Sequence, residues 1–121
     1  MDLSRVYDGQ DIEKVFMFVK DYCHFSNCAA GCCTYPLTCL NVHNSFHFVK
    51  YEDGEFKKIE DKVDPKYIEK YKEIKKIHET VPQVFVFSKN KWYYVGGCND
   101  FMKVTEHSKE KNNHTNYRVK F

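Results

Sequence analysis

The sequence predicts one domain of the α/β class, with a central mixed four-stranded sheet flanked by helices. Apolar runs of strand length alternate along the chain with segments of helical periodicity. Residues Val15–Val19 are apolar at every position, as expected for a central strand that is covered on both faces. The 121 residues, of which 42% are hydrophobic and 17% aromatic, suffice for a single core. We therefore expect one domain over residues 1–121.

The N-terminal half is expected to alternate helix and strand. Residues Ser4–Ile12 favour a short first helix, and Val15–Val19 is the first buried strand. A helix follows from Cys23 to about Tyr35, where Pro36 ends it because proline removes a backbone donor. Residues 46–51 are expected to form the second strand.

The middle of the chain carries a turn signal and a helix. The dipeptide Asp53–Gly54 predicts a turn, so residues 55–59 are able to return as an extra hairpin strand. Pro65 suits the first turn of a helix that runs to about His78, with apolar side chains at helical spacing.

The last elements are a hairpin and a helix. Strands are expected over residues 84–87 and 92–95, joined by a polar loop. Asn99 or Asp100 is a suitable cap for a final helix. Residues 106–121 are mostly polar and are expected to form a C-terminal surface tail.

Charge and composition exclude several classes of protein. Nineteen basic and seventeen acidic residues leave a formal charge of +2, too small to indicate a nucleic-acid or membrane partner. No apolar run reaches the ~18 residues of a membrane span, and residues 1–5 do not resemble a signal peptide. We expect a cytoplasmic protein, whose six cysteines are free, catalytic or metal-binding instead of disulfide-bonded.

Two distant motifs suggest thiol chemistry. Cys23 follows the first strand and begins a helix, where unpaired N–H groups and the helix dipole favour a thiolate. Lys20 adds a positive charge nearby. Much later come the run Thr80-Val81-Pro82-Gln83 and the turn Gly96-Gly97-Cys98-Asn99-Asp100. In order and spacing, over about residues 13–102, these motifs resemble the glutaredoxin family.

The resemblance implies a thioredoxin-like fold and a glutathione-dependent oxidoreductase. Its nucleophile would be Cys23, acting on glutathionylated or disulfide-bonded proteins. Val81 and Pro82 would be joined by a cis peptide bond facing the nucleophile. Glutathione would be bound by Lys20, Tyr22, Cys23, Thr80, Val81, Pro82, Gly97, Cys98, Asn99 and Asp100. Candidates for its glycine carboxylate are Lys75, Lys76 and His78, although the lysine-rich run is also typical of a solvated helix face.

The active-site sequence Cys23-His24-Phe25-Ser26 departs from the dithiol pattern because serine replaces the second cysteine. It resembles the Cys-Gly-Phe-Ser signature of monothiol glutaredoxins, with His24 in place of glycine. Monothiol glutaredoxins hold a [2Fe-2S] cluster between two chains, and its ligands are glutathione and the cysteine that corresponds to Cys23. A cluster carrier, and with it a homodimer, is therefore the alternative function, although a side chain at His24 enters the space where a cluster would approach the backbone.

The remaining cysteines have two interpretations. Cys28 lies about 140° around an ideal helix from Cys23 and should point away from it. Cys98 is either a second redox thiol or a small residue buried under a turn. Cys28, Cys32 and Cys39 would share one stripe of an unbroken helix as core residues. A metal site that also includes Cys33 is the alternative, but the spacing lacks a zinc knuckle, so we expect no metal there.

Overall fold

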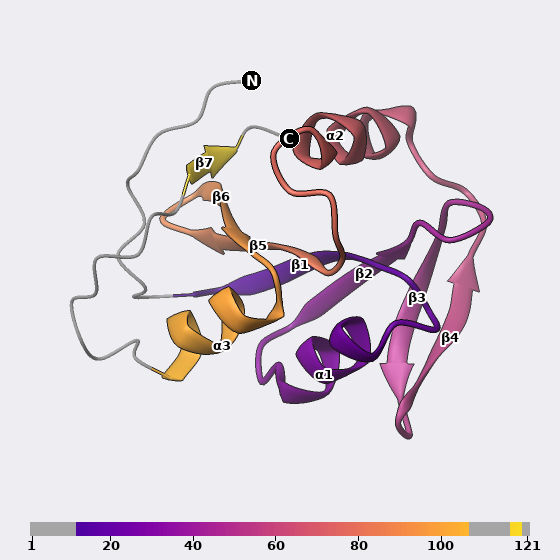
Figure 1. The fold of residues 1–121 in the computed structure, drawn as a ribbon, viewed down its shortest axis with the longest axis horizontal. Helices are drawn as coiled ribbons and strands as arrows, with labels where there is room; N and C mark the ends of the chain where they lie inside the picture. The colour runs from indigo at the N-terminus through magenta and orange to yellow at the C-terminus, as the bar shows by residue number, and fades with distance from the viewer. Residues whose placement is uncertain (1–11, 107–116, 120–121) are drawn as a thin grey trace.

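The computed structural model describes residues 12–106 and 117–119, which form a mixed α/β fold with a seven-stranded sheet (Figure 1). The three described helices are α1 (His24–Cys32), α2 (Pro65–Lys75) and α3 (Cys98–Glu106). The strands are β1 (Lys14–Val19), β2 (Leu37–Asn41), β3 (His47–Glu52), β4 (Glu55–Glu60), β5 (Gln83–Ser88), β6 (Lys91–Gly96) and β7 (Tyr117–Val119). The α/β class is confirmed, whereas the expected number of four strands is too small.

The spatial order of the strands is β4-β3-β2-β1-β5-β6-β7. Strand β1 runs parallel to β2 and antiparallel to β5, and all other neighbours are antiparallel. The parallel pairing of β1 with β2 requires a crossover connection, and α1 provides it. Strand β1 therefore lies in the middle of the sheet, with three strands on each side.

The main correction concerns the chain after α1. The helix ends at Cys32, so Cys39 does not continue the stripe of Cys28 and Cys32. Leu37–Asn41 is the parallel partner of β1, although we assigned these residues to no element. The strand expected at 46–51 is instead β3, which pairs antiparallel with β2, and β4 completes the extra hairpin that the Asp53–Gly54 turn predicted.

The hairpin of β5 and β6 agrees with the sequence prediction. Lys89 and Asn90 at its tip both have positive φ, 53° and 64°. This is the backbone geometry of the tight turns that match the twist of a two-stranded ribbon.

The C-terminal segment adds a strand where we expected a tail. Tyr117–Val119 pairs with residues 92–94 of β6 and widens the sheet. The rest of that segment, residues 107–116 and 120–121, lies outside the described residues. So does the short helix expected at Ser4–Ile12, apart from Ile12 itself.

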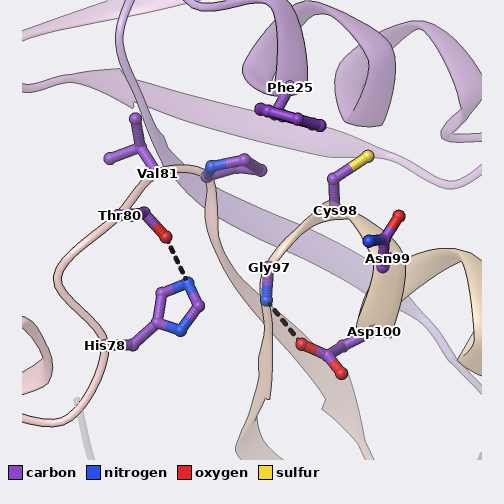
Figure 2. Close-up of a pocket in the computed structure, with 9 residues that line it drawn as sticks. Phe25, His78, Thr80, Val81, Gly97, Cys98, Asn99 and Asp100 are labelled. Atoms are coloured by element: carbon purple, nitrogen blue, oxygen red, sulfur yellow. Dashed lines mark hydrogen bonds between the residues drawn. The ribbon is translucent and has the colours of Figure 1, made fainter.

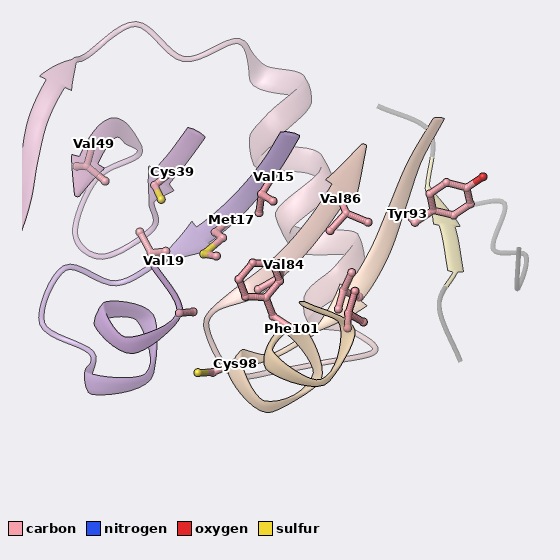
Figure 3. Packing of buried hydrophobic residues seen from close by; sticks show 13 residues of the cluster. Val15, Met17, Val19, Cys39, Val49, Val84, Val86, Tyr93, Cys98 and Phe101 are labelled. Carbon is pink, nitrogen blue, oxygen red and sulfur yellow. The ribbon is translucent and has the colours of Figure 1, made fainter. Parts of the chain in front are cut away.

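Two apolar layers cover the two faces of the sheet. On one face α1 and α3 pack on valines and Met17 of the central strands, with Phe101 fully buried (Figure 3). On the other face α2 buries Tyr71 and Ile74 against aromatic residues such as Phe18. Each α-helix therefore contributes to a core, and the sheet holds the three helices in place. Within the described part of the chain, no helix has the length and apolar character required to cross a bilayer.

Cys39 is expected to resist alkylation in the native protein. Its side chain is buried in β2, and burial, with the nearby Cys33 thiol, raises its pKa from 9.0 to about 12. Labelling with iodoacetamide at pH 8, followed by peptide mapping, should modify the exposed Cys32 and spare Cys39 until the protein is unfolded. Since the raised pKa belongs to the folded state, the stability from this thiol is complete below pH 9 and is lost as the pH rises towards 12. Equal labelling rates at Cys32 and Cys39 in the native protein would contradict this burial.

Candidate functional site

Cys23 lies where the chain leaves the sheet and enters α1. It is the N-cap residue of that helix, with extended backbone angles (φ −81°, ψ 125°). Its N–H group donates to the Lys20 carbonyl at 3.0 Å, and its own carbonyl accepts from the backbone and the side chain of Asn27. The Sγ atom makes no capping hydrogen bond. The backbone of Cys23 is thus fixed while its thiol stays available for chemistry at the helix N-terminus.

The loop before β5 brings a second segment to this thiol. The Val81–Pro82 peptide bond is cis, which confirms the sequence prediction. The Cys23 Sγ atom lies 3.9 Å from the carbonyl oxygen of Val81. Residues 58 positions apart in the chain therefore face one another.

The third component is the glycine turn between β6 and α3. Gly96 has φ +126°, and a Cβ atom placed on it would overlap the Asp100 carboxylate. That carboxylate accepts a hydrogen bond from the Gly97 N–H group at 3.0 Å, while the Gly97 carbonyl accepts from Phe101. Only glycine fits the first position, because both the backbone angle and the close approach of Asp100 exclude a side chain.

We expect Gly96→Ala to destabilise the protein by ~3 kcal/mol, because it combines a glycine-only backbone conformation with loss of the Asp100 contact. Gly54→Ala is a matched control, since Gly54 also has positive φ (80°) but has no atom within 4 Å of the added carbon. Its cost should be only ~1 kcal/mol. Urea unfolding of both variants measures the difference. Equal losses would show that the turn at Asp100 does not depend on a glycine.

These segments enclose a pocket of about 250 Å³ (Figure 2). Phe25 reaches it from α1, and Cys98 and Asn99 reach it from the start of α3. The residues that line it are Phe25, His78, Thr80, Val81, Pro82, Gly97, Cys98, Asn99 and Asp100. The Thr80-Val81-Pro82 segment and the glycine turn thus line one cavity, together with Phe25 of α1.

His78 contacts Thr80 and lies close to Gly97, so it approaches both segments of the pocket. Its Nε2 atom lies 3.0 Å from the Thr80 hydroxyl, and the same atom would be 3.3 Å from a Cβ on Gly97. Its carbonyl accepts a hydrogen bond at 2.7 Å from the side chain of Gln83, which is fully buried. Gln83 therefore fixes the loop that carries His78, and His78 narrows the pocket opposite Gly97.

The Asp100 carboxylate also acts on a tyrosine of the neighbouring strand β6. Tyr94 is buried on β6, and burial together with the negative charge of Asp100 raises the pKa of its hydroxyl. No described residue accepts or donates a hydrogen bond at this hydroxyl. The charge of Asp100 thus acts on a buried hydroxyl group of β6 that stays neutral.

The structure brings together seven of the ten residues expected to bind glutathione. The remaining three, Lys20, Tyr22 and Cys23, do not line the pocket, although the Cys23 Sγ atom lies 3.9 Å from the Val81 carbonyl oxygen. Tyr22 is 64% exposed, and its ring lies 4.4 Å from that of His43.

The three residues expected to bind the glycine carboxylate of glutathione also differ in position. His78 lines the pocket, whereas Lys75 and Lys76 are exposed and do not line it. The Lys75 ammonium lies 5.8 Å from the ring centre of Tyr71 on the same helix. The lysine-rich part of α2 therefore has the solvated character that we considered as the alternative.

Phe25 is the pocket residue that the sequence reasoning missed. It is 56% exposed and forms the α1 wall of the cavity. Its position two residues after Cys23 was the available signal, because long side chains in a helix lean back towards its N-terminus, where Cys23 lies.

The other thiols divide into distinct environments. Cys98 is buried, and its pKa is raised by burial and by the neighbouring thiols of Cys28, Cys32 and Cys23. The Cys28 Sγ atom lies 3.5 Å from Nε2 of His24. No group of three or more potential metal ligands occurs among the described residues. The raised pKa favours the neutral thiol form of Cys98, which lines the pocket.

Comparisons of the chain with protein-family models, with curated proteins and with solved structures gave no match.

Proposed function

We propose that this chain is a glutathione-dependent thiol–disulfide oxidoreductase of glutaredoxin type, with a thioredoxin-like core. The four central strands support the fold, since β2-β1-β5-β6 contains one parallel pair joined through α1 and two antiparallel neighbours. Strands β3, β4 and β7 would then be additions to that core. The function rests on one observation, that a free thiol at a helix N-terminus faces the Val81–Pro82 cis bond beside a peptide-sized pocket.

Glutathione would lie across the pocket with its sulfur towards Cys23. The Val81 backbone is suited to pair with its cysteinyl amide, because Pro82 places no N–H group in the way. The γ-glutamyl end would meet the N-terminus of α3, where Gly97, Cys98, Asn99 and Asp100 lie. The Asp100 carboxylate attracts the γ-glutamyl ammonium group, and the first N–H groups of α3 attract its carboxylate.

The reaction would proceed in two balanced exchanges. The Cys23 thiolate attacks the glutathione sulfur of a mixed disulfide, which forms a Cys23–glutathione disulfide and releases the client cysteine as a thiolate. A second glutathione thiolate then attacks the bound glutathione sulfur. This step releases glutathione disulfide and regenerates the Cys23 thiolate. Lys20 contributes positive charge near the reacting sulfurs.

A direct test is to map the adduct that forms with glutathione disulfide. Incubation followed by peptide mass mapping should place glutathione on Cys23, with Cys32 as the exposed comparison thiol. Preferential modification of Cys32, with Cys23 unmodified, would contradict the proposed nucleophile. The cytoplasm, where thiols stay reduced, is the compartment that suits such a cycle.

An iron–sulfur carrier is the alternative, and the environment of Ser26 favours it. Ser26 is fully buried where a resolving cysteine would lie, so Cys23 has no thiol partner on its own helical turn. Cys23 is suited to ligate a [2Fe-2S] cluster shared by a homodimer, with glutathione supplying the other thiolates. Protein purified anaerobically with glutathione would then be brown and dimeric. A colourless monomer that turns over mixed disulfides would support the oxidoreductase.

A further inference from the structure

Asn41 is a polar residue buried at the carboxyl end of β2. Only 1% of it is exposed, and in the register of the sheet it pairs with Val19, the last residue of β1. Because β1 and β2 are parallel, the chain leaves β1 at this same end and enters the loop of residues 20–23, which leads to Cys23. Burying an amide is costly unless its donors and its acceptor find partners. The partners of Asn41 therefore indicate what this residue holds in place.

The amide oxygen of Asn41 binds the loop of residues 20–23. Its Oδ1 atom accepts a hydrogen bond of 3.1 Å from the N–H group of Asp21, two residues before Cys23. The N–H group of Lys20 donates to the Ser26 hydroxyl at 3.3 Å, and the Lys20 carbonyl accepts from the Cys23 N–H group at 3.0 Å. The bonds of Lys20 thus stay within the loop and α1, whereas the bond of Asp21 ties the backbone of the loop to β2.

The amide nitrogen of Asn41 binds the loop between β2 and β3. Its Nδ2 atom donates to the His43 carbonyl at 2.9 Å and to the Ser45 carbonyl at 3.4 Å, and it lies 3.5 Å from Nε2 of His47. Carbonyl oxygens only accept hydrogen bonds, and the Asp21 N–H group only donates, so these neighbours fix which way the amide faces. One buried side chain therefore links the loops that follow two parallel strands.

Exposed side chains of the same two loops also touch. The His43 Nδ1 atom lies 3.3 Å from the Asp21 carboxylate, and the ring centres of His43 and Tyr22 are 4.4 Å apart. Water competes for all three side chains, and contacts between exposed charged groups contribute little. The buried amide is thus the stronger of the two links between these loops.

We propose that Asn41 is a positioning residue for Cys23, the nucleophile of the proposed function. Through the Asp21 N–H group it holds the backbone that leads into Cys23. This keeps the thiol at the N-terminus of α1 and 3.9 Å from the Val81 carbonyl oxygen. The helix dipole acts on a thiolate only near the first turn, so a displaced loop makes Cys23 less reactive. The effect on catalysis rests on the proposed function, whereas the effect on the reactivity of Cys23 does not.

Alkylation of the protein measures this reactivity directly. Asn41→Ala should lower the rate at which iodoacetamide modifies Cys23 at pH 7 by at least ~5-fold. The difference should narrow at pH 10, where the thiol ionises without help from the helix. Peptide mapping identifies the modified residue, and the exposed Cys32 is the internal reference, whose rate should not change. An unchanged rate at Cys23, or a loss of equal size at both pH values, would overturn the proposal.

Two control variants separate positioning from other effects. His43→Ala removes the side-chain contacts with Asp21 and Tyr22 but keeps the backbone carbonyl that Asn41 binds, so Cys23 should keep its rate within ~2-fold. Val49→Ala removes a buried side chain from β3 and should destabilise the fold without changing that rate. If either control lost as much reactivity as Asn41→Ala, the effect would belong to exposed contacts or to stability, and Asn41 would have no positioning role.

Hydrogen exchange tests the bond in the wild type, whether or not the variants fold. The Asp21 amide should be protected, and exchange at the rate of an unstructured peptide would contradict its bond to Asn41.

Activity separates this proposal from the proposed function. Asn41→Ala should slow the reduction of a glutathionylated peptide by the factor seen in alkylation. If the wild type has no such activity but alkylation of Cys23 depends on Asn41, the oxidoreductase is wrong and the positioning role stands. If the wild type is active and Asn41→Ala is equally active, the positioning role is wrong and the oxidoreductase stands.

Discussion

Cys23→Ser is expected to abolish the reduction of a glutathionylated peptide. A hydroxyl group at that position does not ionise near neutral pH. Cys98 also lies at the start of a helix and lines the pocket with Val81 and Pro82, but it is buried and its pKa is raised. The rate should fall to that of glutathione alone. This rate is measured as the release of the peptide thiol, in an assay in which the glutathione disulfide formed is reduced again.

Cys28→Ser is the matched control for this result. Cys28 is partly buried against the core between α1 and α3, and it lies beside His24 instead of the Val81–Pro82 loop. Its loss should leave a rate of the same order as that of the wild type. If both variants retain their fold and both are inactive, the assignment of Cys23 as the sole nucleophile is wrong.

Ser26→Cys should produce the largest gain, at least ~10-fold, in the reduction of an insulin-like protein disulfide. The new thiol would lie on the same helical turn as Cys23, where an intramolecular attack on a Cys23 mixed disulfide gains from proximity. The wild type lacks such a partner. Burial and the neighbouring thiols raise the pKa of Cys98, which makes it a poor nucleophile near neutral pH.

Ser26→Ala separates the effect of the thiol from the loss of the hydroxyl. The Ser26 hydroxyl accepts a hydrogen bond from the Lys20 N–H group at 3.3 Å, so its removal alone should weaken the turn without adding chemistry. A gain in Ser26→Cys and none in Ser26→Ala is the expected pattern. No gain on the protein disulfide would mean that Cys98 or another native thiol already resolves the intermediate, or that Cys23 is not the nucleophile.

The elements that the sequence predicted well carry strong local signals. Strand β1 is uniformly apolar, α2 begins at a proline after a capping aspartate, and the β5–β6 hairpin has a polar tip. Strand β2 was missed because Leu37–Asn41 is short and lies next to a helix rich in cysteine. Its position depends on pairing with β1, which is a tertiary contact that no local pattern reports.

The site was predictable where the chain itself constrains the geometry. Gly96 needs its unusual backbone angle, and Pro82 allows a cis bond, so both could be placed from the sequence. The orientation of Tyr22 could not, because it depends on His43, which a different loop brings beside it. Likewise, the approach of His78 to Gly97 depends on Gln83 holding the loop through a buried hydrogen bond.

The outer strand β4 bears on how the protein behaves at high concentration. It ends the sheet at one side, and its side chains include Glu55, Lys57, Lys58 and Glu60, with a shift of register opposite Phe48 and Val49. A neighbouring molecule that extended the sheet here would have to desolvate alternating charges and follow an irregular backbone. This edge of the sheet consequently disfavours edge-to-edge association between molecules, even when the protein is concentrated.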